Sequence, residues 1–108
     1  MANALVSQRL LEDGTVVIDL RGELDIAVND ALRDVLVDTI NTRRPPRLLV
    51  NMRHVTFVDS TGMSALLAGY NAARAAGVAY AVRDVAPFVE KQLRTTGIYD
   101  QLVSPDEP

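Results

Sequence analysis

The chain has 108 residues, of which 48% are hydrophobic and 23% are charged. These values are close to those of an average soluble globular domain, and a chain of this length can bury one core without covalent cross-links. Cysteine is absent, which excludes disulfide bonds, a thiolate zinc site and a cysteine nucleophile. The only histidine is His54. Composition therefore does not favour an enzyme, and we expect no catalytic residue, metal site or cofactor.

The formal net charge is −3, from 11 basic and 14 acidic residues, so no overall cationic surface is available for nucleic acid. The one local basic cluster, Arg43, Arg44 and Arg47, flanks two prolines and is interpreted as a solvated loop. No apolar run reaches the roughly 18 residues that a membrane span needs. The N-terminus lacks the pattern of a secretory signal. We expect a cytoplasmic protein that binds neither nucleic acid nor membrane.

No repeat or linker divides the chain, so we predict one domain over residues 1–108, with its core at 5–103 and a polar tail at 104–108. The first predicted elements are two strands, at 5–11 and 15–21. The Asp-Gly pair between these apolar runs is typical of a hairpin turn.

Residues 22–25 are predicted to form a loop, followed by an amphipathic helix at 27–41 whose apolar residues recur at helical spacing. Asp25 is suitably placed to cap the free N–H groups at the start of that helix. Pro45 and Pro46 prevent its continuation. The short apolar run at 47–51 is typical of a central buried strand.

Residues 52–56 are predicted to form a loop, with Phe57 and Val58 in the core. A helix is predicted from about 61 to 76 and is ended by Gly77. Its inward-facing residues are predicted to be Met63, Leu66, Leu67, Tyr70 and Ala73.

The last predicted elements are a strand at 78–83, a helix at 84–96 and a short apolar segment at 98–103. Pro87 lies in the first turn of the helix, where proline is tolerated, and Gly97 ends it. The inward side chains of this helix are predicted to be Val85, Phe88, Val89 and Leu93. The order of elements predicts an α/β domain with a mixed β-sheet packed with α-helices.

The most informative segment is residues 57–63, Phe-Val-Asp-Ser-Thr-Gly-Met. It places the Ser60 hydroxyl at a helix N-terminus, where free N–H groups favour an anion. A phosphoryl group on Ser60 is expected to gain some of these N–H donors. Asp59 would stand beside it as a fixed negative charge, and Gly62 would allow another backbone to approach closely.

Two other interpretations compete for this segment. Ser, Thr and Asp at a helix start commonly serve only as caps. A serine nucleophile on a hydrolase elbow requires G-x-S-x-G and a histidine base after the serine, whereas this chain has V-D-S-T-G with His54 before it. The missing base disfavours a hydrolase, and no nucleotide-binding glycine motif occurs.

In order and spacing, Gly22-Glu23-Leu24-Asp25, the strand at 47–51 and Asp59-Ser60-Thr61-Gly62 resemble the STAS family. More narrowly, the chain resembles the small bacterial anti-sigma factor antagonists, over residues 5–103. Thr95-Thr96-Gly97-Ile98 resembles a further signature of that family. Where many members have Gly-Leu-Gly, this chain has Gly62-Met63-Ser64, and the final helix of the family is expected to be missing or very short.

The resemblance implies a regulator that is switched by phosphorylation at Ser60, with Thr61 as a second acceptor. Its partners would be an ATP-dependent anti-sigma factor serine kinase, which the unmodified form binds to release a sigma factor, and a serine phosphatase. The chain alone would be a monomer or weak dimer. The alternative is a STAS subunit of another signalling or lipid-transport complex. The residues implied in partner binding are Glu23, Asp25, Asp59, Ser60, Thr61, Gly62 and Met63.

Overall fold

A computed structural model describes residues 6–103, so the polar tail predicted at 104–108 lies outside the described residues. The elements in chain order are β1 (Val6–Leu10), β2 (Val16–Leu24), α1 (Asn29–Arg43), β3 (Arg47–Val58), α2 (Ser60–Ala76), β4 (Ala79–Arg83), α3 (Pro87–Thr95) and α4 (Tyr99–Leu102).

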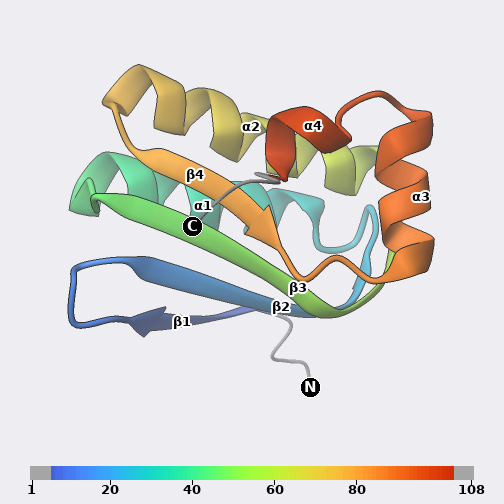
Figure 1. The fold of residues 1–108 in the computed structure, drawn as a ribbon, viewed down its shortest axis with the longest axis horizontal. Coiled ribbons are helices and arrows are strands. Elements are labelled where there is room, and N and C mark those ends of the chain that lie inside the picture. Colours follow the sequence, from blue (N-terminus) through green and yellow to red (C-terminus); the bar gives the residue numbers. More distant parts are fainter. Residues whose placement is uncertain (1–5, 104–108) are drawn as a thin grey trace.

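The strands form one sheet in the order β1-β2-β3-β4. β1 is antiparallel to β2, whereas β2, β3 and β4 are parallel to one another, which confirms the predicted mixed sheet. Helices α1 and α2 lie side by side against the sheet, α3 stands at the end where β3 finishes, and α4 contacts α2 (Figure 1). Within residues 6–103, no helix covers the other face of the sheet, which we call the open face.

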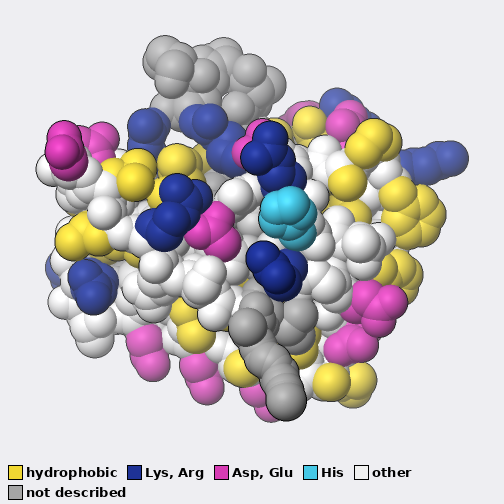
Figure 2. Space-filling view, turned by 90° about the horizontal axis from the view of Figure 1, so that it is seen from below, with side chains coloured by type: hydrophobic (Ala, Val, Ile, Leu, Met, Phe, Trp, Pro, Cys, Tyr) yellow, Lys and Arg dark blue, Asp and Glu magenta, His cyan; other side chains and the backbone are white. Residues whose placement is uncertain are grey.

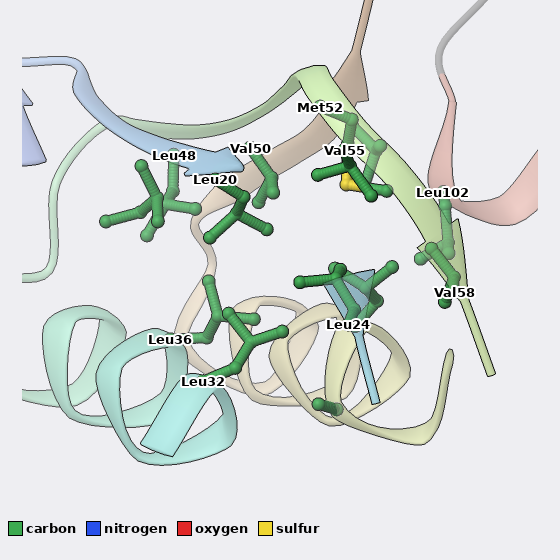
Figure 3. Packing of buried hydrophobic residues seen from close by; sticks show 14 of the residues in the cluster. Leu20, Leu24, Leu32, Leu36, Leu48, Val50, Met52, Val55, Val58 and Leu102 are labelled. Carbon is green, nitrogen blue, oxygen red and sulfur yellow. The ribbon is translucent and has the colours of Figure 1, made fainter. Parts of the chain in front are cut away.

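The core lies between the sheet and these two helices. Leu20, Leu48 and Val50 from the strands point toward Leu32 and Leu36 of α1 (Figure 3). All five side chains are at most 2% exposed. The helical spacing of apolar residues therefore identifies the buried face of α1 correctly, and the burial of Leu48 and Val50 agrees with the central buried strand predicted at 47–51.

A small residue lets α2 approach the sheet closely at Gly69. A Cβ atom at Gly69 would lie 2.7 Å from the Tyr80 hydroxyl, which donates a hydrogen bond of 2.8 Å to the Leu66 carbonyl. Gly77 takes the left-handed conformation (φ +73°) that ends α2, which confirms the predicted cap. The last element of the described residues is the four-residue helix α4, which lies within the short apolar segment predicted at 98–103.

The predicted loop at 52–56 is wrong, because β3 runs without a break to Val58. The pairing of β3 with β2 shifts register twice: Asp19 pairs with Asn51 but Arg21 with His54, and Gly22 with Val55 but Glu23 with Phe57. Each shift is a bulge that adds one residue to β3. The buried residues of this half of β3 are therefore three apart, at Met52, Val55 and Val58, and the alternation expected of a strand is lost.

The other corrections concern loops and exposed aromatic rings. Residues 22–24 belong to β2 rather than to a loop. Asp25 does not cap α1: its carboxylate accepts a hydrogen bond from the Ala27 N–H at 3.0 Å, within the turn that precedes the helix. Phe57, which follows the second bulge, is 37% exposed and Phe88 on α3 is 58% exposed, so neither ring is in the core.

Gly62 determines how closely the start of α2 approaches the end of β2. A Cβ atom at Gly62 would lie 2.5 Å from the Leu24 carbonyl oxygen and 2.9 Å from the Leu24 Cβ. Real Cβ atoms do not come this close to backbone atoms, so any other residue at this position must push the two segments apart.

We predict that Gly62→Ala lowers the free energy of unfolding by about 1–3 kcal/mol, the usual cost of an overpacked contact. Urea denaturation measures this effect. Ser64→Ala, an exposed position on the same helix, is the control and should change stability by less than about 0.5 kcal/mol. Equal stability of Gly62→Ala and the unmodified chain would contradict this account of the contact.

Candidate functional site

The two sequence motifs meet where β2 and β3 end. Parallel strands place their carboxyl ends at one edge of a sheet, where binding sites of α/β proteins commonly lie. Glu23 pairs with Phe57 and Leu24 with Val58. The Asp59 N–H then donates a hydrogen bond of 3.1 Å to the Leu24 carbonyl. The end of β2 and the start of α2 therefore form one continuous surface.

The Asp59 carboxylate organises the first turn of α2. Its Oδ1 accepts hydrogen bonds from the Thr61 N–H at 2.9 Å, the Gly62 N–H at 2.9 Å and the Thr61 hydroxyl at 2.6 Å. The hydroxyl and N–H of Thr61, with the Gly62 N–H, hold the pKa of Asp59 below its usual value, and the Ile26 N–H adds to this. Asp59 is therefore the N-cap of α2, and it is ionised at neutral pH.

Ser60 differs from its neighbours because its side chain is exposed and uncommitted. It is the first residue of α2, and its hydroxyl has no hydrogen-bond partner within residues 6–103. The adjacent Thr61 hydroxyl, by contrast, is held by Asp59.

The N–H groups expected to receive a phosphate on Ser60 are already in use. Those of Thr61 and Gly62 bond to the Asp59 side chain, and that of Met63 donates to the Asp59 carbonyl at 3.0 Å. In the unphosphorylated chain, Asp59 therefore already occupies these three N–H groups.

The other residues implied in partner binding lie around this turn but differ in access. Glu23 is exposed and Asp25 is half-buried. Met63 is only 9% exposed, and Gly62 is buried against Leu24. Glu23 and Asp25, together with Asp59, supply carboxylates to this end of the molecule, whereas Gly62 contributes close packing.

Gln92 on α3 is a positioning residue that the sequence interpretation missed. Its Nε2 donates to the Val58 carbonyl at 2.9 Å, and its Oε1 accepts from the Val58 N–H at 3.1 Å. Pairing of β3 with β4 stops at Asn51, so Gln92 takes the place of a strand at Val58. The signal was present, because Gln92 is a polar residue three positions after the buried Val89, on the inward face of the helix.

Exposed apolar side chains surround the site. We call Ile26, Phe57 and Phe88 the apolar rim; they are 76%, 37% and 58% exposed. The other two large apolar side chains exposed among the described residues, Leu10 and Leu11, lie at the β1–β2 hairpin. A shallow groove of about 420 Å³ adjoins the rim and is lined by Met63, Phe88, Lys91, Gln92, Thr95 and Thr96.

The site has no partner for nucleophilic chemistry in the described part of the chain. His54 lies on the open face of the sheet, paired in register with Arg21, and makes no hydrogen bond with Ser60. No group of three or more acidic or histidine side chains within residues 6–103 could hold a metal ion. Across the same residues, no helix is long and apolar enough to cross a membrane.

Replacing Gln92 by alanine removes both hydrogen bonds to Val58. Because each is worth about 0.5–1.5 kcal/mol, we predict a loss of about 1–3 kcal/mol in the free energy of unfolding and faster hydrogen exchange at the Val58 amide. Amide exchange by NMR measures both effects. Lys91→Ala, an exposed neighbour on α3, is the control. Unchanged protection of the Val58 amide in Gln92→Ala would show that Gln92 does not hold the end of β3.

The lowered pKa of Asp59 predicts a pH-dependent contribution to stability. A carboxylate whose folded pKa lies below its unfolded value stabilises the fold above the unfolded value, near pH 4, and this contribution is lost as the pH falls through the folded pKa. The stability difference between the unmodified chain and Asp59→Asn should therefore be full at pH 7 and shrink below about pH 4. Urea denaturation across this range measures it, with the exposed Asp34→Asn as control. A difference independent of pH would contradict the prediction.

The chain is similar to several known proteins, among them anti-sigma factor antagonists. The chain is 29% identical over 86 residues to an anti-sigma F factor antagonist from Paenibacillus polymyxa. The aligned region covers 80% of this chain and 74% of that protein. It also resembles the unphosphorylated form of the anti-sigma factor antagonist SpoIIAA, with a TM-score of 0.76, 22% identity and coverage of 91% and 85%. For phosphorylated SpoIIAA from Bacillus the TM-score is 0.71 at 21% identity, with coverage of 91% and 88%.

These structures share the fold with the chain. The STAS domain model matches residues 9–106, nearly the whole chain. That match includes both motifs that meet at the candidate site. The chain therefore belongs to the STAS domain family.

Proposed function

We propose that this protein is an anti-sigma factor antagonist. In its unmodified form it binds an anti-sigma factor that is also a serine kinase, and so releases a sigma factor. Phosphorylation of Ser60 by that kinase, using ATP, ends the binding, and a serine phosphatase restores it. The relative from Paenibacillus polymyxa and SpoIIAA are both named as anti-sigma factor antagonists, and SpoIIAA occurs in a phosphorylated form. In this role the chain is a substrate and a switch rather than a catalyst.

The observation that carries the proposal is the difference between two neighbouring hydroxyls. A kinase must bring an unencumbered hydroxyl to the γ-phosphate of ATP, and the exposed Ser60 meets this requirement. The Thr61 hydroxyl donates a 2.6 Å hydrogen bond to Asp59, and its removal would disturb the N-cap of α2. We therefore propose Ser60 as the acceptor in preference to Thr61.

Electrostatics explains why a phosphate would end binding. A phosphate on Ser60 adds about −1.5 to −2 charges beside the ionised Asp59, and Glu23 and Asp25 lie at the same edge of the sheet. Because Asp59 already occupies the nearby N–H donors, the phosphate would face outward into the partner surface. An uncompensated charge buried in an interface costs about 3–5 kcal/mol, which weakens binding by about two to three and a half orders of magnitude.

The apolar rim supplies the area that an interface needs. Ile26, Phe57 and Phe88 lie around an otherwise polar turn, and burying such side chains stabilises association. We propose that the anti-sigma factor covers the rim and the Ser60 hydroxyl together. Gly62 would act indirectly, by keeping Leu24 and the start of α2 in contact.

The first test is binding of serine variants to the cognate anti-sigma factor, measured by isothermal titration calorimetry. Ser60→Ala should bind within threefold of the unmodified chain, whereas Ser60→Asp should bind at least tenfold more weakly because it adds a charge at the interface. Asn41→Asp adds the same charge at the far end of α1 and is the control. Equal binding of Ser60→Asp and Ser60→Ala would contradict the electrostatic switch.

The second test maps the phosphorylated residue by mass spectrometry after incubation with the cognate kinase and ATP. In the chain without substitutions, we predict phosphorylation at Ser60 and none at Thr61. In Ser60→Ala, the labelling should be lost. Labelling at Thr61, or none at Ser60, would contradict the assignment of the acceptor. The exposed Ser64, one turn further along α2, is an internal control for accessibility.

A further inference from the structure

A second polar site lies on the open face of the sheet. It is a hollow of about 240 Å³ lined by Ser7, Asp19, Leu20, Arg21, Asn51, Arg53 and His54. In the view from below, basic side chains lie directly above and below the chain's one histidine, His54 (Figure 2). This concentration of positive charge contrasts with the net charge of −3 of the whole chain.

The first bulge of β3 builds this hollow. Between the pairs Asp19–Asn51 and Arg21–His54, β3 contributes one residue more than β2. As a result Arg53 and His54 are both exposed, whereas in a regular strand one of the two would face the core. Arg21, opposite His54, completes a set of three nitrogen-rich side chains around one hollow.

The one carboxylate that lines the hollow, Asp19, is already paired with a cation. Asp19 accepts two hydrogen bonds from the Arg9 guanidinium, at 2.7 and 3.1 Å, and one from the Asn51 amide at 2.8 Å. The hydrogen bond from Arg9 is the main reason that the pKa of Asp19 lies below its usual value, with a smaller contribution from Asn51. Asp19 is therefore ionised and fully engaged with other groups, so it does not compete for Arg21 or Arg53.

The guanidinium groups of Arg21 and Arg53 have no hydrogen bond or ion pair within residues 6–103. By contrast, the Arg94 side chain pairs with Glu90 at 2.8 Å and stacks on Tyr99. Two guanidinium forks that line one small hollow, neither paired with another described residue, match the geometry by which arginine binds phosphate or carboxylate.

We propose that this hollow binds an oxyanion, either a phosphate or a carboxylate group, between Arg21 and Arg53. The neighbouring Ser7 hydroxyl and His54 ring supply further polar contacts at its wall. The site is independent of Ser60, because it is built by β1, β2 and the middle of β3 on the open face of the sheet.

NMR titration of the full chain with inorganic phosphate, against sodium chloride of equal ionic strength, tests the proposal. Amide resonances of residues 19–21 and 51–54 should shift and saturate. Arg21→Gln and Arg53→Gln should each raise the dissociation constant about tenfold, the loss expected for one charge-assisted contact. Arg43→Gln, an exposed arginine at the end of α1, is the matched control and should leave the constant unchanged.

A second titration with acetate identifies the group. Saturation by phosphate alone assigns the site to phosphoryl groups, and saturation by acetate assigns it to carboxylates. Shifts that stay linear with both ions, or that are equal in Arg21→Gln, Arg53→Gln and the unmodified chain, would overturn the proposal. The Ser60 switch is measured separately, so either idea can fail while the other stands.

Discussion

The close contact between Gly62 and the Leu24 carbonyl is the constraint on which the candidate site depends. Without a side chain at Gly62, the start of α2 can lie directly on the end of β2. The Asp59 N–H donates to the same carbonyl, and the Asp59 side chain caps the helix that begins there. Two motifs more than 30 residues apart are thereby joined in one surface, with the Ser60 hydroxyl exposed on it.

The two bulges of β3 connect the architecture to both proposed sites. Each adds a residue that turns a pair of side chains outward. The first exposes Arg53 and His54 on the open face, and the second exposes Thr56 and Phe57 beside the Ser60 turn. Gln92 then holds the end of the strand at Val58. β3 therefore contributes exposed side chains to both proposed sites, while Met52, Val55 and Val58 stay in the core.

Much of the fold could be predicted from sequence because burial follows local periodicity. Leu32 and Leu36 on α1, and Met63, Leu66 and Ala73 on α2, are buried as their spacing predicts. The second half of β3 could not be predicted, since its bulges replace the two-residue alternation of a strand by a three-residue spacing. A bulge depends on pairing with β2, a tertiary contact that no local pattern contains.

The site was predictable in its residue types but not in its hydrogen bonds. That Asp59, Ser60 and Thr61 begin a helix follows from the motif, yet only the structure shows that Asp59 engages Thr61 and leaves Ser60 uncommitted. Gln92 escaped notice because its partner is a backbone group 34 positions away.

The most direct measurement compares the affinity of the anti-sigma factor for the unmodified chain and for the chain phosphorylated at Ser60. A weakening of two orders of magnitude or more is the predicted result; equal affinities would contradict the account.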